Sequence, residues 1–234
     1  MKQKTKKFHI LTALPGVIDS YFLGGMMRKA VDKKIISVKE HNLHDYSSNK
    51  YGSVDDTPYG GGAGMVMSVE PIYKCLKKIS TKHQVLSTKR RVVGFSASGK
   101  VMTQRDVERL AKYDEVIFVC GRFEGYDARV KEFLDEELAI GQYVLTGGEL
   151  PALVVIDAVT RLIPGVLGNT QSAIDESHSA DGVLEYPQYT KPEIFEYKEK
   201  GKKKILKVPE VLRSGNHALI KKWREENRGG SKLF

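Results

Sequence analysis

Strand-like and helix-like segments alternate along the first two thirds of this 234-residue chain. Apolar runs typical of buried strands cover residues 8–14, 35–40, 91–96 and 115–120. Helical spacing of apolar residues follows or separates them, over residues 18–32, 69–79, 103–112 and 127–134. Because parallel strands need a crossover connection, usually a helix, this alternation predicts an α/β fold with a mainly parallel sheet. A further apolar segment, residues 148–162, predicts a helix that stops at Pro164 and is buried either in the sheet layer or at a subunit contact.

Two glycine-rich turns, residues 121–125 and 140–151, stand where a strand is expected to give way to a helix. Glycine permits positive φ and lets the backbone approach a ligand, whose polar edges the N–H and C=O groups then recognise. Plain tight turns are the alternative reading of the glycines. Plain turns do not require the polar residues interleaved with these glycines, namely Arg122, Glu124, Gln142, Tyr143 and Glu149. The two turns therefore predict a cofactor pocket.

Two other glycine-rich stretches resemble nucleotide-binding motifs and fail at defined positions. Residues 94–101 come within one residue of a phosphate loop, but Val101 stands where the loop needs a hydroxyl for magnesium. An NTPase is therefore disfavoured. Residues 59–64 have the glycines of a dinucleotide-binding turn without their spacing, and no apolar strand precedes them. We interpret this stretch as a flexible loop over a site.

The cysteine count and hydropathy limit the class of protein. Cys75 and Cys120 are the only cysteines and lie far apart, without a partner at metal-ligand spacing, so neither a disulfide framework nor a zinc site is expected. No metal site is predicted, and magnesium dependence is left open. No run approaches the ~18 to 20 apolar residues that a membrane span needs. These features favour a reduced, cytoplasmic setting without membrane contact.

The positive charge is concentrated at one end of the chain. The net charge is +9, and residues 191–234 hold 13 Lys and Arg against 6 acidic residues. A solvated lysine-rich surface is the common explanation, but an excess of this kind also predicts a polyanionic partner, RNA or DNA. Residues 165–190 lack any sustained period. We therefore expect a domain at 1–167, a linker or functional loop at 168–182 and a basic domain at 183–234.

Six motifs in the same order resemble the bacterial tRNA (guanine-N1)-methyltransferases of the TrmD family. They occupy residues 59–65, 119–125, 140–151, 161–168, 189–192 and 214–224, and the resemblance runs from about residue 8 to residue 228. It implies a SPOUT-type α/β fold, whose parallel sheet is flanked by helices and contains a deep trefoil knot. It further implies a small, mainly helical C-terminal domain and a homodimer.

The implied reaction transfers a methyl group from S-adenosylmethionine to N1 of the tRNA guanosine 3′-adjacent to the anticodon. N1 of neutral guanine carries a proton, so methylation needs a carboxylate to accept that proton and a cation to stabilise charge on O6. Two alternatives stay open: another SPOUT-type RNA methyltransferase, and an RNA-binding module without catalysis.

The resemblance also assigns roles to individual residues. It implies that Glu124 holds the cofactor and the target base, and that Arg161 faces guanine O6. The general base falls in an acidic loop, on Asp175 or Glu176, because this chain reads Asp-Glu-Ser-His where the family commonly reads Glu-Asp-Ser-Phe; Asp175 is favoured. Cofactor binding is assigned to Phe95, Ser96, Ala97, Gly121, Phe123, Gly125, Ile140, Gly141, Gln142, Tyr143, Val144, Leu145, Gly147 and Gly148.

Overall fold

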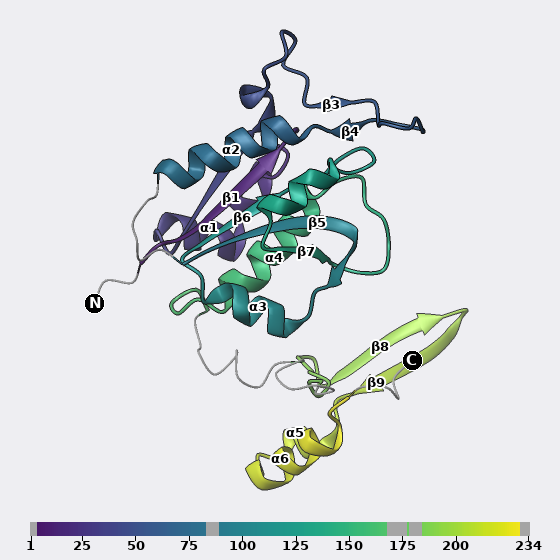
Figure 1. Ribbon diagram of the computed structural model, residues 1–234. Coiled ribbons are helices and arrows are strands. Elements are labelled where there is room, and N and C mark those ends of the chain that lie inside the picture. Colours follow the sequence, from purple (N-terminus) through teal and green to yellow (C-terminus); the bar gives the residue numbers. More distant parts are fainter. Residues whose placement is uncertain (1–3, 83–88, 168–176, 178–183, 230–234) are drawn as a thin grey trace. The chain divides into compact units, whose positions relative to one another are not determined.

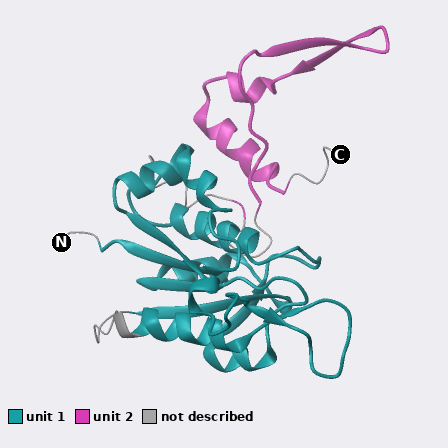
Figure 2. Cartoon of the chain, turned by 90° about the horizontal axis from the view of Figure 1, so that it is seen from above, with its two compact units in different colours: residues 1–170 teal, residues 171–234 magenta. Residues whose placement is uncertain are grey.

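The computed structural model describes residues 4–82, 89–167, 177 and 184–229. The chain divides into two compact units, Met1–Thr170 and Gln171–Phe234, which Figure 2 shows in different colours. The first unit contains a five-stranded sheet with helices, and the second contains a two-stranded hairpin with two helices.

The sheet of the first unit is parallel throughout (Figure 1). From edge to edge its strands are β2 (Ile36–Asn42), β1 (Lys6–Thr12), β6 (Glu115–Val119), β5 (Arg90–Val101) and β7 (Glu136–Ala139). The predicted α/β class and the four predicted strands are confirmed. Strand β7 was not predicted, because this short strand begins with two glutamates and has no apolar run.

Helices cover both faces of this sheet. Ile72 and Cys75 of α2 (Val69–Lys82) pack against alternate strand residues such as Leu11. Phe8 and Ile10 belong to the cluster on the opposite face. That face is covered by α1 (Gly25–Asp32), α3 (Gln104–Ala111) and α4 (Glu149–Arg161). Burial on both faces explains why the central strands are apolar at successive positions instead of alternating with polar residues.

Two predicted helices differ from those in the structure. Residues 18–32 form a 3₁₀ helix, η1 (Asp19–Leu23), and then α1, because Gly24 is extended and Gly25 has a φ of 59°. Residues 127–134 form the 3₁₀ helix η3 (Ala128–Phe133). The remaining short elements of this unit are η2 (Leu43–Tyr46), β3 (Asp55–Asp56) and β4 (Val66–Met67).

The second unit contains β8 (Ile194–Glu199), β9 (Lys202–Lys207), α5 (Glu210–Arg213) and α6 (His217–Glu226). Helix α6 was predicted at about residues 216–227. Its N-terminus is capped by Asn216, whose side chain accepts hydrogen bonds from the N–H groups of Ala218 and Leu219. The β8–β9 hairpin was not predicted and adds strands to a unit expected to be mainly helical. Successive lysines in β9 hide the alternation by which such strands are recognised.

Asp106 fixes the beginning of α3. Its carboxylate accepts hydrogen bonds from the Thr103 N–H at 3.0 Å and from the Lys100 ammonium at 2.7 Å. Burial raises the pKa of this carboxyl, but hydrogen bonds from Lys100, Thr103 and Arg109 outweigh burial and hold the pKa well below its ordinary value. A carboxyl with a lowered pKa in the folded state stabilises the fold above its unfolded-state pKa, and that contribution is lost as the pH falls.

We expect Asp106→Asn to lower the free energy of unfolding by about 2 kcal/mol at pH 7, because the cap and its charged hydrogen bonds are weakened. The difference from the wild type should shrink as the pH falls below about 4, the unfolded-state pKa of aspartate. Urea denaturation across this pH range measures both effects. Asp32→Asn is the control, since the pair that Asp32 forms with Arg28 within the described residues is exposed to solvent. Equal stability losses in the two variants would contradict the expectation.

Candidate functional site

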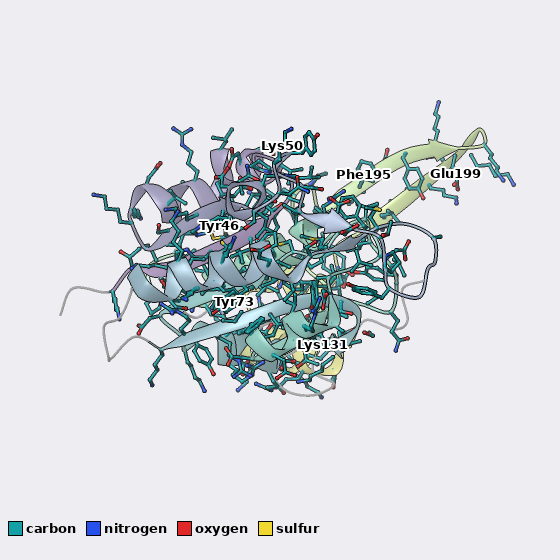
Figure 3. All side chains as sticks on the ribbon, turned by 45° about the horizontal axis from the view of Figure 1, so that its top comes forward. Tyr46, Lys50, Tyr73, Lys131, Phe195 and Glu199 are labelled. Carbon is teal, nitrogen blue, oxygen red and sulfur yellow. The ribbon has the colours of Figure 1, made fainter. Side chains whose placement is uncertain are left out.

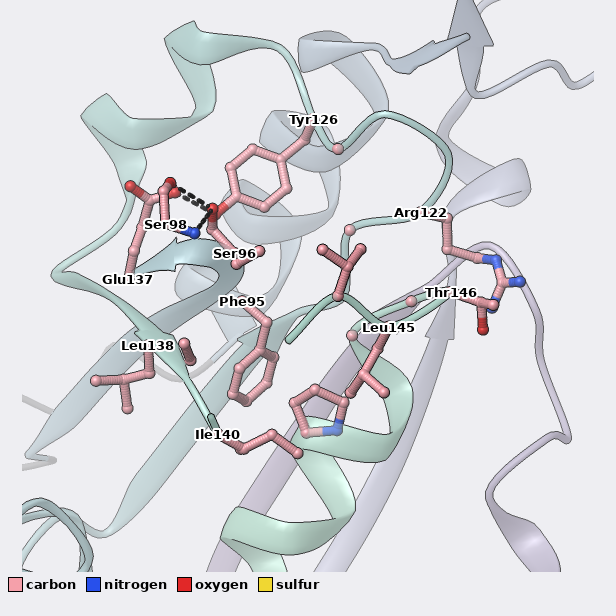
Figure 4. A pocket seen from close by; sticks show the side chains of 18 of the residues that line it. Phe95, Ser96, Ser98, Arg122, Tyr126, Glu137, Leu138, Ile140, Leu145 and Thr146 are labelled. Carbon is pink, nitrogen blue, oxygen red and sulfur yellow. Dashed lines mark hydrogen bonds between the residues drawn. The ribbon is translucent and has the colours of Figure 1, made fainter. Parts of the chain in front are cut away.

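A cavity of about 440 Å³ lies at the carboxyl ends of the adjacent strands β6, β5 and β7. Its walls come from three segments that follow or end those strands, residues 95–98, 121–131 and 137–151. Figure 4 shows Phe95, Leu138, Ile140 and Leu145 around the cavity. Ligands of α/β proteins commonly bind at the carboxyl ends of the strands, and cavities of this size hold small organic cofactors.

The structure brings together nearly all of the residues to which cofactor binding was assigned. Gln142 is the exception, since it does not line the cavity. Glu124 lies in the wall among the others. Some residues that line the cavity had no cofactor role assigned from the sequence. Thr146 and Pro151 belong to the second glycine-rich turn, and Ser98 belongs to the incomplete phosphate loop. No motif marks the others: Tyr126, Ala128, Lys131, Glu137, Leu138 and Ala139.

The first wall is an irregular end of β5. The pairing of β5 with β7 shifts register between Phe95 and Lys100, so the residues between them leave the regular ladder. Within this bulge the hydroxyl groups of Ser96 and Ser98 lie 2.9 Å apart. The lysine of the incomplete phosphate loop, Lys100, instead donates to Asp106 at 2.7 Å. It therefore belongs to the start of α3 and not to a phosphate cradle.

The two glycine-rich turns meet each other through their backbones. The Gly148 N–H donates to the Gly121 carbonyl at 2.9 Å, and Arg122 forms a backbone bridge with Gly147. A Cβ added at Gly148 would lie 2.7 Å from the Cα of Cys120, closer than real Cβ atoms approach a backbone. Glycine is required at residue 148 by this contact. The turns thus form one continuous wall of the cavity.

A buried carboxylate holds the same two turns to β1. Glu149, in the first turn of α4, accepts a hydrogen bond from the Thr12 hydroxyl at 2.7 Å and pairs with Arg122 at 3.2 Å. Its negative charge also suits the positive end of the helix dipole. The sequence placed Arg122 and Glu149 in the turns as polar residues, and the structure shows that they pair with each other.

Two acidic side chains, Glu124 and Glu137, also line the cavity. Glu137 accepts a hydrogen bond from the Tyr126 hydroxyl at 2.7 Å and pairs with Lys131 at 2.7 Å. Burial and this hydrogen bond raise the pKa of Tyr126, so its hydroxyl stays a donor at neutral pH. The side chain of Glu124 lies against Gly64, and the backbone N–H of Glu124 donates to the Met65 carbonyl. The loop predicted at residues 59–64 therefore adjoins the cavity wall at Glu124.

The proposed catalytic residues do not all lie at this cavity. Arg161 is at the last turn of α4, whereas the cavity is at the first turn. The 13-residue helix separates the two ends by about 18 Å, given its rise of about 1.5 Å per residue. Asp175 and Glu176 lie outside the described residues.

Three further features of the described residues bear on the function: the Cys120 thiol, possible metal ligands and the length of the helices. Burial raises the pKa of the Cys120 thiol well above its ordinary value, which does not suit a nucleophile. Within the described residues, no cluster of His, Cys, Asp and Glu could hold a metal ion. The described helices are also too short or too polar to cross a membrane.

Comparison with known proteins agrees with the resemblance seen in the motifs. A family model described as tRNA (Guanine-1)-methyltransferase TrmD matches residues 6–231. A tRNA (guanine-N(1)-)-methyltransferase from Clostridioides difficile is 45% identical over 221 residues, which is 94% of this chain and 91% of the relative. The enzyme of the same name from Staphylococcus carnosus is 45% identical and covers 95% of this chain, with 85% of its own length aligned.

A solved structure is similar over nearly the same length. The crystal structure of tRNA (m1G37) methyltransferase from Aquifex aeolicus aligns with a TM-score of 0.73 and 36% sequence identity. The alignment covers 93% of this chain and 87% of the Aquifex chain.

Proposed function

Because the chain belongs to the tRNA (guanine-1)-methyltransferase family, we propose that it methylates N1 of the tRNA guanosine 3′-adjacent to the anticodon. The observation that carries this proposal is the match over residues 6–231, which includes the three segments that form the cavity. The implied methyl donor is S-adenosylmethionine. We expect the enzyme to act in the cytoplasm, where tRNA is modified.

The chemistry of the cavity fits this cofactor. Phe95, Leu138 and Ile140 offer apolar surface for an adenine ring, and the backbone of the glycine-rich turns offers donors and acceptors for its edges. The carboxylate of Glu124 suits the positive sulfonium and ammonium groups, whereas that of Glu137 already pairs with Lys131. When bound, S-adenosylmethionine supplies a methyl group already activated by its sulfonium. The protein then has to align guanine N1 with the methyl carbon.

The protein must also move one proton and stabilise one charge. We propose that Arg161 stabilises the charge that develops on guanine O6, and that Asp175 or Glu176 accepts the N1 proton. We propose that Glu124, whose carboxylate lies in the cavity wall, holds the target base beside the cofactor. These roles stay proposals, and the family resemblance supports them.

We propose that the active site is completed by a second copy of the chain. Arg161 lies about 15 Å along its own helix from Pro151, the α4 residue that lines the cavity. The outward face of α4 exposes Leu150 and Val154, although its inward face packs in the core. The neighbouring N-terminal segment, joined to α4 by the Tyr21–Asp157 hydrogen bond, exposes Leu23. Exposed apolar residues on neighbouring elements are typical of an interface, and a homodimer would bring Arg161 to its partner's cavity.

The direct test uses an unmodified tRNA transcript with guanosine 3′ to the anticodon and S-adenosylmethionine. Nucleoside analysis of the product should show 1-methylguanosine, and a transcript with adenosine at that position should stay unmethylated. Methylation at another atom or position would favour a different SPOUT-type RNA methyltransferase. Binding of tRNA without methyl transfer would favour the RNA-binding alternative.

A further inference from the structure

The β8–β9 hairpin presents two different faces, and its register assigns each side chain to one of them. The turn residues Lys200 and Gly201 both have positive φ, at 49° and 75°, as in the tight turns that suit twisted hairpins. Directly paired residues of antiparallel strands share a face. Phe195 pairs with Leu206, and Tyr197 pairs with Lys204. Because side chains alternate along a strand, all four lie on one face, which we call the aromatic face.

The aromatic face offers flat apolar surface to the solvent. The rings of Phe195 and Tyr197 are stacked, with centroids 5.8 Å apart and an angle of 20° between their planes. Phe195 is 54% exposed and Leu206 is 57% exposed. Figure 3 labels Phe195 and Glu199 on β8. A two-stranded hairpin is marginally stable alone, so apolar surface exposed on it needs a functional reason.

The charge around this surface favours an anionic partner. Residues 194–207 contain six lysines and two glutamates, a net charge of +4. The glutamates pair with Lys203 and Lys204. For the other four lysines, the described part of the chain provides no carboxylate at ion-pair distance: Lys198, Lys200, Lys202 and Lys207.

We infer that the aromatic face stacks on unpaired bases of the tRNA substrate while the hairpin lysines contact the flanking phosphates. The inference rests on the proposed function for the identity of the RNA. Lysines alone would suit any polyanion, but stacked rings beside surplus cations suit nucleotides whose bases are not paired. A tRNA presents such bases in its loops. Duplex RNA does not, since its bases are stacked on each other.

The opposite face of the same hairpin provides a matched control. Ile205 lies there, paired with Glu196, and is 48% exposed. We expect Phe195→Ala to raise the Kd for an unmodified tRNA transcript by about 5- to 100-fold, the range expected for losing one stacked base. Ile205→Ala should change the Kd less than twofold. Phe195→Trp should retain wild-type affinity, because tryptophan also stacks.

The salt dependence of tRNA binding distinguishes the contribution of the lysines from that of the Phe195 ring. Lys202→Gln should reduce the slope of log Kd against log salt by about 1, whereas Phe195→Ala should leave that slope unchanged. Circular dichroism and S-adenosylmethionine binding should be the same for all variants, which shows that the remainder of the fold is intact.

Several results would overturn the inference. Equal losses of tRNA affinity in Phe195→Ala and Ile205→Ala would show that the hairpin matters only as a folded element. Unchanged affinity in Phe195→Ala would show that the ring does not contact RNA. A change in self-association instead of tRNA affinity would identify the face as a protein contact. Failure of the proposed function is distinct, because wild-type protein would then bind tRNA without forming 1-methylguanosine.

Discussion

Arg161→Ala should lower the single-turnover rate of methyl transfer by about 100- to 1,000-fold, the loss typical of removing one group that stabilises a developing oxyanion. Because Arg161 lies outside the cavity of its own chain, S-adenosylmethionine affinity should stay within about twofold of wild type. Single-turnover assays with saturating cofactor and equilibrium titration of cofactor measure the two quantities. Arg28→Ala is the control, since Arg28 lies outside the cavity lining and, in the part of the chain that the structure describes, forms an exposed pair with Asp32.

Mixed dimers test whether Arg161 acts at the cavity of its own chain or at that of the partner chain. A second variant, Gly141→Val, should lose cofactor binding because its Cβ would overlap the Tyr143 ring and displace this side chain, which lines the cavity. Each variant alone should be nearly inactive. If Arg161 serves the partner's cavity, a mixed dimer has one complete site, and random mixing should restore about a quarter of wild-type activity. Inactive mixtures that demonstrably contain mixed dimers would contradict a shared site.

Gly148→Ala should abolish measurable S-adenosylmethionine binding and lower the free energy of unfolding by about 1 to 3 kcal/mol, as expected for overpacking a well-packed core. The added Cβ would meet the Cα of Cys120 at 2.7 Å, and no flexible side chain can move aside to relieve the contact. The backbone hydrogen bond to Gly121 would then lengthen and separate the two turns. Calorimetric titration of the cofactor and urea denaturation measure the two losses.

Gly24→Ala is the matched control for this substitution. Gly24 has an ordinary φ of −135°, and a Cβ added there meets nothing within 4 Å. The Gly24→Ala variant should bind the cofactor with wild-type affinity. If Gly148→Ala also binds cofactor normally, contact between the two turns is not what shapes the cavity.

Local patterns of apolar residues were sufficient to predict most of the strands and helices that form the core. Strands β1, β5 and β6 have apolar runs because both faces of the sheet are covered, so their signal is strong. The edge strand β2 has a weaker signal, since it is polar apart from Ile36 and Val38. Strand β7 has no such run, and β9 is exposed at every residue, so neither produces an apolar pattern. The break at Gly24 and Gly25 depends on the backbone conformation of these two glycines, which the helical spacing of apolar residues does not report. The implied trefoil knot stays a prediction.

The candidate site was predictable where glycines mark it and not where tertiary contacts form it. The two turns were identified because glycines interleaved with polar residues have few purely structural explanations. The Tyr126–Glu137 hydrogen bond and the Thr12–Glu149 contact join residues 11 and 137 positions apart in the sequence. No local pattern encodes such pairs. The position of Arg161, one helix length from the cavity, likewise required the structure.

The strand order also determines when the enzyme can become functional during its synthesis. Strands β1 and β5 are not neighbours, because β6 lies between them and pairs with both. While the ribosome has made only the first hundred residues, the inner edge of β1 therefore has no partner and is open to aggregation. Even after β6 has paired with β1 and β5, the second glycine-rich turn has not yet been synthesised. A nascent chain that ends before the second glycine-rich turn would thus have its central strands paired, but it could not bind the cofactor.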